Sequence, residues 1–138
     1  MTAEKEGVES SEEVHRPLVL IVDDDKFNRH ILAEFLKEMG FDVITASDGM
    51  EGWERYIEYL PELVISDLNM PQMDGIALLS QIKKHNKNQV VFLVTGYYDQ
   101  DQLAGDTDYY PDVCLNKPFT IADLQSSIIS AFGYDPTQ

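Results

Sequence analysis

Unbroken apolar runs alternate along this chain with stretches in which apolar residues recur every three or four positions. The first run, residues 18–22, contains only Leu, Val and Ile, which is typical of a strand buried on both faces of a sheet. The next stretch, residues 26–39, has Phe27, Ile31 and Phe35 at intervals of four residues. This spacing predicts a helix with a broad apolar face.

The same alternation continues towards the C-terminus. Further strands are predicted at residues 42–46, 62–66, 90–94 and 112–116. The helices around them are predicted to bury these stripes: Met50, Trp53, Ile57 and Leu60; Ile76, Leu79 and Ile82; and Ile121, Leu124, Ile128 and Phe132. Asp48, Asp74 and Thr120 are predicted N-caps. The helix that contains Ile82 is expected to fray from Lys83 onwards.

The segment 97–111 breaks this pattern. A fourth helix belongs here, but Gly105 and the Asp-Thr-Asp run after it oppose helix formation. We therefore expect a short or irregular helix. The four tyrosines of the segment either pack over the sheet edge or form a surface for a partner.

Strands that alternate with helices form parallel sheets through right-handed crossovers, with helices on both faces. The sequence therefore predicts an α/β fold, a doubly wound sheet of five parallel strands, in one domain at residues 17–134. Residues 1–16 are polar and acidic without apolar periodicity, which predicts a disordered leader. Residues 135–138 are expected to be a short tail.

Acidic residues outnumber basic ones, with 25 Asp and Glu against 10 Lys and Arg and a formal net charge of −15. This balance argues against direct binding to nucleic acid or to anionic membranes. No apolar run has the length of a membrane span, and the leader lacks the apolar region of a signal peptide. The lone cysteine, Cys114, excludes an intrachain disulfide and suits a reducing, cytoplasmic setting. We expect it to be a small buried hydrophobe.

Polar residues follow four of the five predicted strands. They are Asp23, Asp24 and Asp25 after the first strand, Asp67 after the third, Thr95 after the fourth and Lys117 after the fifth. In a doubly wound sheet these strand ends share one edge, where ligands bind. Each residue alone has an ordinary explanation as part of a turn or loop. Their occurrence together, in this order, indicates a site.

The chemistry of such a site follows from its groups. Clustered carboxylates repel one another unless a hard cation balances them, and Mg²⁺ binds one or two carboxylates together with waters and phosphate oxygens. A hydroxyl and an ammonium can bind the remaining oxygens of a phosphoryl group. An aspartate oxygen in line with that group can attack it and form an aspartyl phosphate.

Four motifs between residues 18 and 132 carry a resemblance: "LIVDDD", "LVISDLNMPQMDG", "FLVTG" and "NKPF". With them the chain resembles the receiver domains of bacterial two-component response regulators. The resemblance implies a flavodoxin-like sheet of strand order 2-1-3-4-5 and a signalling switch in a two-component system or phosphorelay. It implies a histidine kinase or histidine phosphotransfer protein as phosphodonor and a downstream protein as partner. It implies no enzymatic activity beyond the domain's own phosphoryl transfer and dephosphorylation.

The resemblance also assigns roles to single residues. Asp67 is the expected phosphoacceptor, Thr95 supplies the hydroxyl that turns towards the phosphate, and Lys117 pairs with it. The expected Mg²⁺ ligands are Asp23, Asp24, Asp67 and the backbone carbonyl of Asn69. The Lys117–Pro118 bond is expected to be cis, as is usual in the family.

Two departures from the family pattern affect output. Receivers often carry Tyr or Phe where this chain has Cys114, and a cysteine cannot reproduce the inward swing of an aromatic ring. The atypical segment 97–111 replaces the usual fourth helix. The resemblance therefore supports phosphorylation better than it supports the usual output mechanism.

Other functions remain to be weighed. A receiver-like binding module that signals without phosphate is the alternative reading. A haloacid-dehalogenase-type phosphohydrolase needs a second acid two residues after its nucleophile, where this chain has Asn69. A flavodoxin-like electron carrier is disfavoured because three aspartates after the first strand repel a flavin phosphate. We expect a monomer or a weak dimer through the last helix, where Ile129 lies off the buried stripe.

Overall fold

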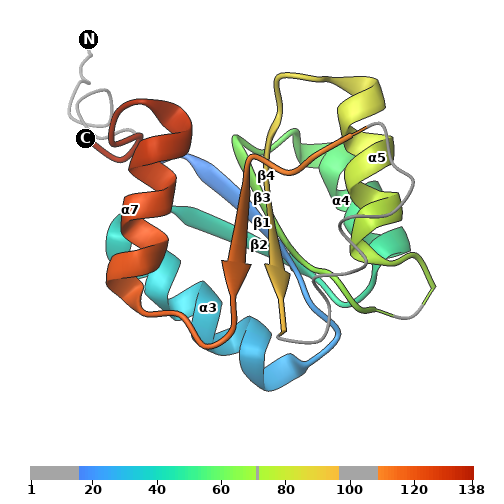
Figure 1. Ribbon diagram of the computed structural model, residues 1–138, viewed down its shortest axis with the longest axis horizontal. Helices are drawn as coiled ribbons and strands as arrows, with labels where there is room; N and C mark the ends of the chain where they lie inside the picture. The colour runs from blue at the N-terminus through green and yellow to red at the C-terminus, as the bar shows by residue number, and fades with distance from the viewer. Residues whose placement is uncertain (1–15, 71, 97–108) are drawn as a thin grey trace, which may run out of the picture.

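The computed structural model describes residues 16–70, 72–96 and 109–138 (Figure 1). Its sheet has five parallel strands in the order β2-β1-β3-β4-β5, which confirms the predicted fold. The strands are β1 (Leu18–Val22), β2 (Asp42–Ala46), β3 (Leu63–Asp67), β4 (Val90–Thr95) and β5 (Val113–Asn116). The helices are α3 (Lys26–Met39), α4 (Gly49–Tyr59), α5 (Gly75–His85) and α7 (Ile121–Phe132). The predictions for the leader and for residues 97–108 lie outside the described residues.

Both faces of the sheet are covered by helices. Side chains in β1 alternate, so Val19 and Ile21 enter one core while Leu20 and Val22 enter the other, and all four are fully buried. Helices α3 and α7 cover the first face, and α4 and α5 cover the second (Figure 1). Burial on both faces explains why the strands read as unbroken apolar runs. None of the helices in the described part of the chain is long and apolar enough to cross a bilayer.

Each of the four helices named above begins at a side-chain cap. The caps are Asp25, Asp48, Asp74 and Thr120, which confirms the three that were predicted. Thr120 and Asp123 exchange hydrogen bonds, because each side chain accepts the backbone N–H of the other residue at 3.0 Å. The caps fix where the helices leave the loops at the carboxyl edge of the sheet.

Helix α4 buries a different stripe from the predicted one. The members of the predicted stripe that the structure leaves exposed are Met50, Ile57 and Leu60. Its buried residues are Gly49, Gly52 and Tyr56. A Cβ on Gly49 would lie 2.0 Å from the carbonyl oxygen of Met73, and one on Gly52 would lie 3.0 Å from Val22. The helix therefore packs closely against its neighbours at its glycines. A prediction based on the spacing of large apolar residues does not identify these positions.

Three further predictions of burial are wrong. Ile121 is 42% exposed, because it is the first residue of α7 and precedes the buried positions Leu124 and Ile128. Phe27 is 69% exposed, because it lies in the first turn of α3, ahead of the part of the helix that packs on the sheet. Cys114 is also exposed. It lies on β5, an edge strand whose buried residue is Leu115, so it does not enter the core.

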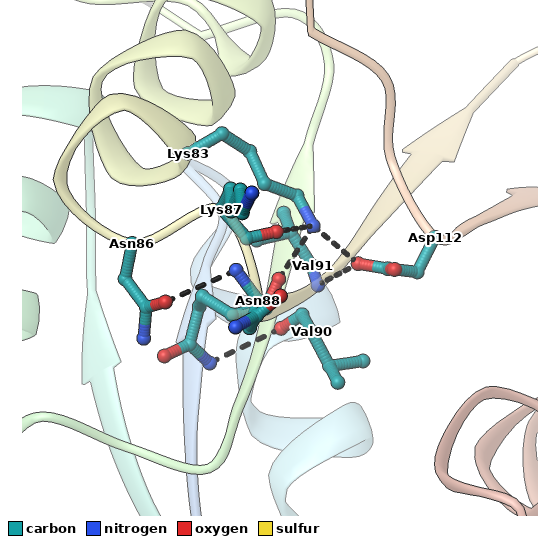
Figure 2. Close-up of polar contacts among 8 residues, drawn as sticks. Lys83, Asn86, Lys87, Asn88, Val90, Val91 and Asp112 are labelled. Carbon is teal, nitrogen blue, oxygen red and sulfur yellow. Dashed lines mark hydrogen bonds and ion pairs between the residues drawn. The ribbon is translucent and has the colours of Figure 1, made fainter.

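Helix α5 continues past Lys83 to His85 instead of fraying there, and Lys83 forms a partly buried ion pair with Asp112 (Figure 2). The Lys83 ammonium lies 2.8 Å from Asp112 Oδ2 and 2.6 Å from the carbonyl oxygen of Gln89. The same Asp112 oxygen accepts the N–H of Val91 at 2.8 Å. One carboxylate thus joins α5, the start of β4 and the residue before β5.

Removing this carboxylate is expected to destabilise the fold more than removing the ammonium. Asp112→Ala leaves Lys83, whose side chain is only 9% exposed, without its counter-charge and Val91 without its acceptor, at a cost of about 2–4 kcal/mol. Lys83→Met keeps the packing and leaves a carboxylate that water reaches, at a cost of about 1–2 kcal/mol. Urea unfolding measures both.

Asp112→Asn is the matched control for this pair, since it keeps an acceptor for Val91 but removes the charge. Its cost should fall between those of the other two variants. A Lys83→Met variant that is less stable than Asp112→Ala would contradict this account of the ion pair.

Candidate functional site

Four strands deliver polar residues to the carboxyl edge of the sheet. Asp23 follows β1, Asp67 is the last residue of β3, Thr95 is the last residue of β4, and Lys117 follows β5. Since all five strands are parallel, these ends lie on one edge. Asp24, directly after Asp23, belongs to the same turn.

The structure brings three carboxylates and one ammonium together at this edge. One oxygen each from Asp23, Asp24 and Asp67 lies within 4.8 Å of the other two. The Lys117 Nζ atom is 3.6 Å from Asp67 Oδ1. The Asp67 side chain is only 11% exposed and Asp23 is buried, whereas Asp24 is exposed. Three formal negative charges therefore gather beside the Lys117 ammonium.

Burial opposes ionisation of the two inner carboxyls. It raises the pKa of Asp67 to about 6, with the Lys117 ammonium acting in the opposite direction and the Asp23 carboxylate adding to the rise. Burial likewise raises the pKa of Asp23, against a hydrogen bond from the Asp25 N–H and the charge of Lys117. Both shifts mark a site where negative charge is costly until a cation compensates it.

These groups fit a divalent cation such as Mg²⁺. Mg²⁺ takes oxygen ligands, commonly one or two carboxylates with several waters, and the partly exposed cluster leaves room for waters. Asp24 faces solvent and gives the cation an approach. The carbonyl of Asn69, predicted as a further ligand, belongs to the exposed residue two positions after Asp67.

Thr95 is at the predicted edge, but its hydroxyl is engaged elsewhere. The residue is fully buried, and its Oγ1 donates to Asn116 Oδ1 at 2.9 Å. Sequence reasoning did not single out Asn116, which lies beside Lys117 at the end of β5. The Lys117–Pro118 peptide bond is cis.

The backbone around Asp67 is held by tight packing. A Cβ on Gly75 would lie 2.4 Å from the Asp67 carbonyl oxygen and 2.8 Å from the Leu68 Cα. The Gly75 N–H donates to the Leu68 carbonyl at 2.8 Å. The chain that follows Asp67 therefore returns onto it, with a glycine at the point of contact.

Arg29 is a further residue at the site that sequence reasoning missed. Its Nη1 donates to the backbone carbonyl of Asp23 at 2.7 Å. A single basic residue on a helix carries little signal by itself. The one sequence feature that could have indicated it is its position as the fourth residue of α3, four residues after Asp25.

A cavity of about 300 Å³ opens beside the charged cluster. Asp23 and Lys117 lie at its polar side, while α3 and the loop after β5 supply apolar walls that include Ile31, Phe35 and Phe119. A bulky side chain of another molecule could enter this cavity and reach the edge of the charged cluster.

Comparisons with known proteins agree with this geometry. Residues 19–129 match the family model of the response regulator receiver domain. A probable chemotaxis protein CheY from Rhizobium etli is 37% identical over 118 residues, which are 83% of this chain and 92% of that protein. Hybrid signal transduction histidine kinase D of Dictyostelium discoideum is 31% identical over 135 residues, 92% of this chain but 8% of the kinase.

Solved structures give the same result for the fold. A response regulator receiver domain protein from Clostridium thermocellum superposes with a TM-score of 0.79 at 29% sequence identity. The match covers 85% of this chain and 94% of that one.

Proposed function

The chain belongs to the response regulator receiver family, and from that premise we propose that it is a phosphoacceptor switch whose Asp67 is phosphorylated in a Mg²⁺-dependent reaction. One observation carries the proposal. Asp67 meets two further carboxylates within 4.8 Å and the Lys117 ammonium at 3.6 Å. This is the set of groups that a phosphoryl transfer to a carboxylate requires.

In the proposed reaction a carboxylate oxygen of Asp67 attacks the phosphorus of the donor. The new O–P bond forms as the bond from phosphorus to the leaving group breaks, and the leaving group keeps that electron pair. Lys117 holds negative charge on the phosphoryl oxygens. Asp23, Asp24, Asp67 and the Asn69 carbonyl would hold Mg²⁺, which would supply electrostatic stabilisation of the same oxygens. In this proposal the chain catalyses only its own phosphoryl transfer and dephosphorylation.

Activation would then depend on Thr95. Its hydroxyl donates to Asn116 in the present structure, and in the proposed switch it leaves Asn116 to bind the phosphoryl group. Cys114 is exposed on β5, and it has no aromatic ring to move inward. We therefore propose that the signal is read out through protein–protein contacts and does not depend on the inward movement of an aromatic ring at position 114.

The proposed donor is a histidine kinase or a histidine phosphotransfer protein, and the proposed reader is a downstream protein. The cavity beside Lys117 supports a protein donor, since it is concave and largely apolar and has Asp23 and Lys117 in its lining. The similarity to a hybrid kinase fits a place in a phosphorelay. Monomers or weak dimers are both compatible with this role.

The test is the mass of the intact protein after incubation with acetyl phosphate and Mg²⁺. We expect one added phosphoryl group that requires Mg²⁺, fails to form when EDTA is present from the start, and is absent from Asp67→Asn. If acetyl phosphate fails, a phosphorylated histidine donor takes its place. No phosphoryl group from either donor would reject the proposal and leave the receiver-like binding module.

A further inference from the structure

Asp23, whose carbonyl belongs to the peptide that joins it to Asp24, is held by hydrogen bonds on several sides. The Asp23 N–H donates to the carbonyl of Ala46 at 3.1 Å, at the end of β2. The Asp23 carbonyl accepts from Arg29 Nη1 at 2.7 Å, and Asp23 Oδ1 accepts the N–H of Asp25 at 2.9 Å. Strand β2, helix α3 and the N–H of Asp25 thus hold one residue of the acidic turn.

Such restraint matters because the turn carries like charges. Asp23 and Asp24 repel each other and Asp67, so the turn is pushed apart when no cation is bound. Mg²⁺ in turn demands a near-octahedral set of oxygens at about 2.0–2.1 Å and tolerates little displacement. If the turn became ordered only when the cation bound, part of the binding free energy would be spent on ordering it, and the affinity would be lower.

We propose that Arg29 is a positioning residue of the metal site, which holds the Asp23–Asp24 peptide so that both carboxylates reach one cation. The proposal rests on the proposed function, in which this cluster binds Mg²⁺. The bond from a guanidinium to a carbonyl is charge-assisted and therefore stronger than a neutral one. Arg29 touches neither the phosphoacceptor nor the cation, and acts through the backbone.

Arg55 offers a matched control within the same fold. Its Nε donates to the carbonyl of Thr45 at 3.3 Å, so it is also an arginine that reaches from a helix to a strand-end carbonyl. Thr45 lies on β2 and carries no ligand of the cluster. Arg55→Met removes the same charge and the same kind of bond as Arg29→Met, together with the 3.4 Å ion pair between Arg55 and Glu51, away from the acidic turn.

The experiment is isothermal titration of Mg²⁺ into the full chain, free of phosphodonor. We expect Arg29→Met and Arg29→Gln to raise the Kd about tenfold, with a partial rescue in Arg29→Lys, which keeps one donor and the charge. Arg55→Met should stay within about twofold of the unaltered chain, because it leaves the ligand backbone in place. Urea unfolding shows which variants are folded.

Phosphorylation separates positioning from a general loss of structure. In Arg29→Met the Mg²⁺ concentration for half-maximal phosphorylation should rise with the Kd, while the rate at saturating Mg²⁺ stays near that of the unaltered chain. An unchanged Kd in folded Arg29→Met or Arg29→Gln would overturn the role of Arg29, as would an equal rise in Arg55→Met. If the unaltered chain itself binds no Mg²⁺, the metal site of the proposed function falls, and the role of Arg29 with it.

Discussion

Replacing Asp67 with asparagine is expected to raise the free energy of unfolding by about 2–3 kcal/mol at pH 7.5 in Mg²⁺-free buffer. Burial raises the pKa of this carboxyl from 3.8 to about 6. The folded protein therefore holds an ionised Asp67 at a cost of about two pKa units, each worth about 1.36 kcal/mol. Asparagine keeps the shape of the side chain and removes the charge that incurs this cost.

The pH dependence fixes the sign of this effect. A carboxyl whose pKa rises on folding binds its proton more tightly in the folded state, so its penalty is complete above pH 6 and is absent below pH 3.8. The advantage of Asp67→Asn should therefore shrink as the pH falls from about 6 to 4. Urea unfolding followed by circular dichroism at a series of pH values measures it.

Asp135 provides a control of opposite sign. The Thr137 hydroxyl and N–H donate to its carboxylate at 2.6 and 2.9 Å and lower its pKa. Asp135→Asn should therefore reduce stability at neutral pH, and the loss should fade in acid. A destabilised Asp67→Asn at pH 7.5, or an advantage that persists at pH 4, would show that burial does not set the energetics of the site.

Gly75→Ala is expected to cost about 3 kcal/mol of stability and to slow the phosphorylation of Asp67 by at least tenfold. The new methyl group would meet backbone atoms of Asp67 and Leu68 at 2.4 and 2.8 Å. Backbone cannot rotate away as a flexible side chain can, so α5 or the end of β3 has to move. Any shift of β3 displaces the attacking oxygen from its line to the phosphoryl group.

Gly133→Ala separates the two effects of Gly75→Ala. Gly133 has φ +81° and no atom within 4 Å of an added Cβ, so alanine there is strained without a clash and should cost about 1 kcal/mol. It lies after α7 and should leave phosphorylation unchanged. Urea unfolding and the rate of phosphoryl transfer from acetyl phosphate together test both variants. A Gly75→Ala protein that phosphorylates at the normal rate would contradict the close packing described above.

The sheet and its functional edge were accessible from sequence because both follow from simple rules. Parallel strands buried on two faces must be apolar throughout, and the strand bounds agree with the predicted runs to within one residue. The strand ends must then share an edge, which places Asp23, Asp67 and Lys117 near one another. The assigned roles of these residues in phosphorylation stay predictions.

Close approach and long-range pairing could not be predicted in this way. Tyr56 is buried because Gly52 allows α4 to pack closely against Val22. The apolar pattern instead favours Trp53 and Ile57, which each lie one position further along the chain. Lys83 appeared to be part of a polar, fraying end because its partner Asp112 lies 29 residues away. Arg29 was missed for a related reason. Its partner is the backbone carbonyl of Asp23, and every residue has such a carbonyl, so the sequence does not mark it as a partner.

The hydrogen bond from Thr95 to Asn116 has a consequence for signalling in the resting cell. If the hydroxyl has to leave Asn116 to reach a phosphoryl group, the bond favours the inactive conformation by about 1 kcal/mol, or roughly fivefold. Residue 116 then sets the background activity of the unphosphorylated protein through its bond to Thr95. Evolution would be able to make the same switch quieter or more responsive by changing one side chain at the end of β5.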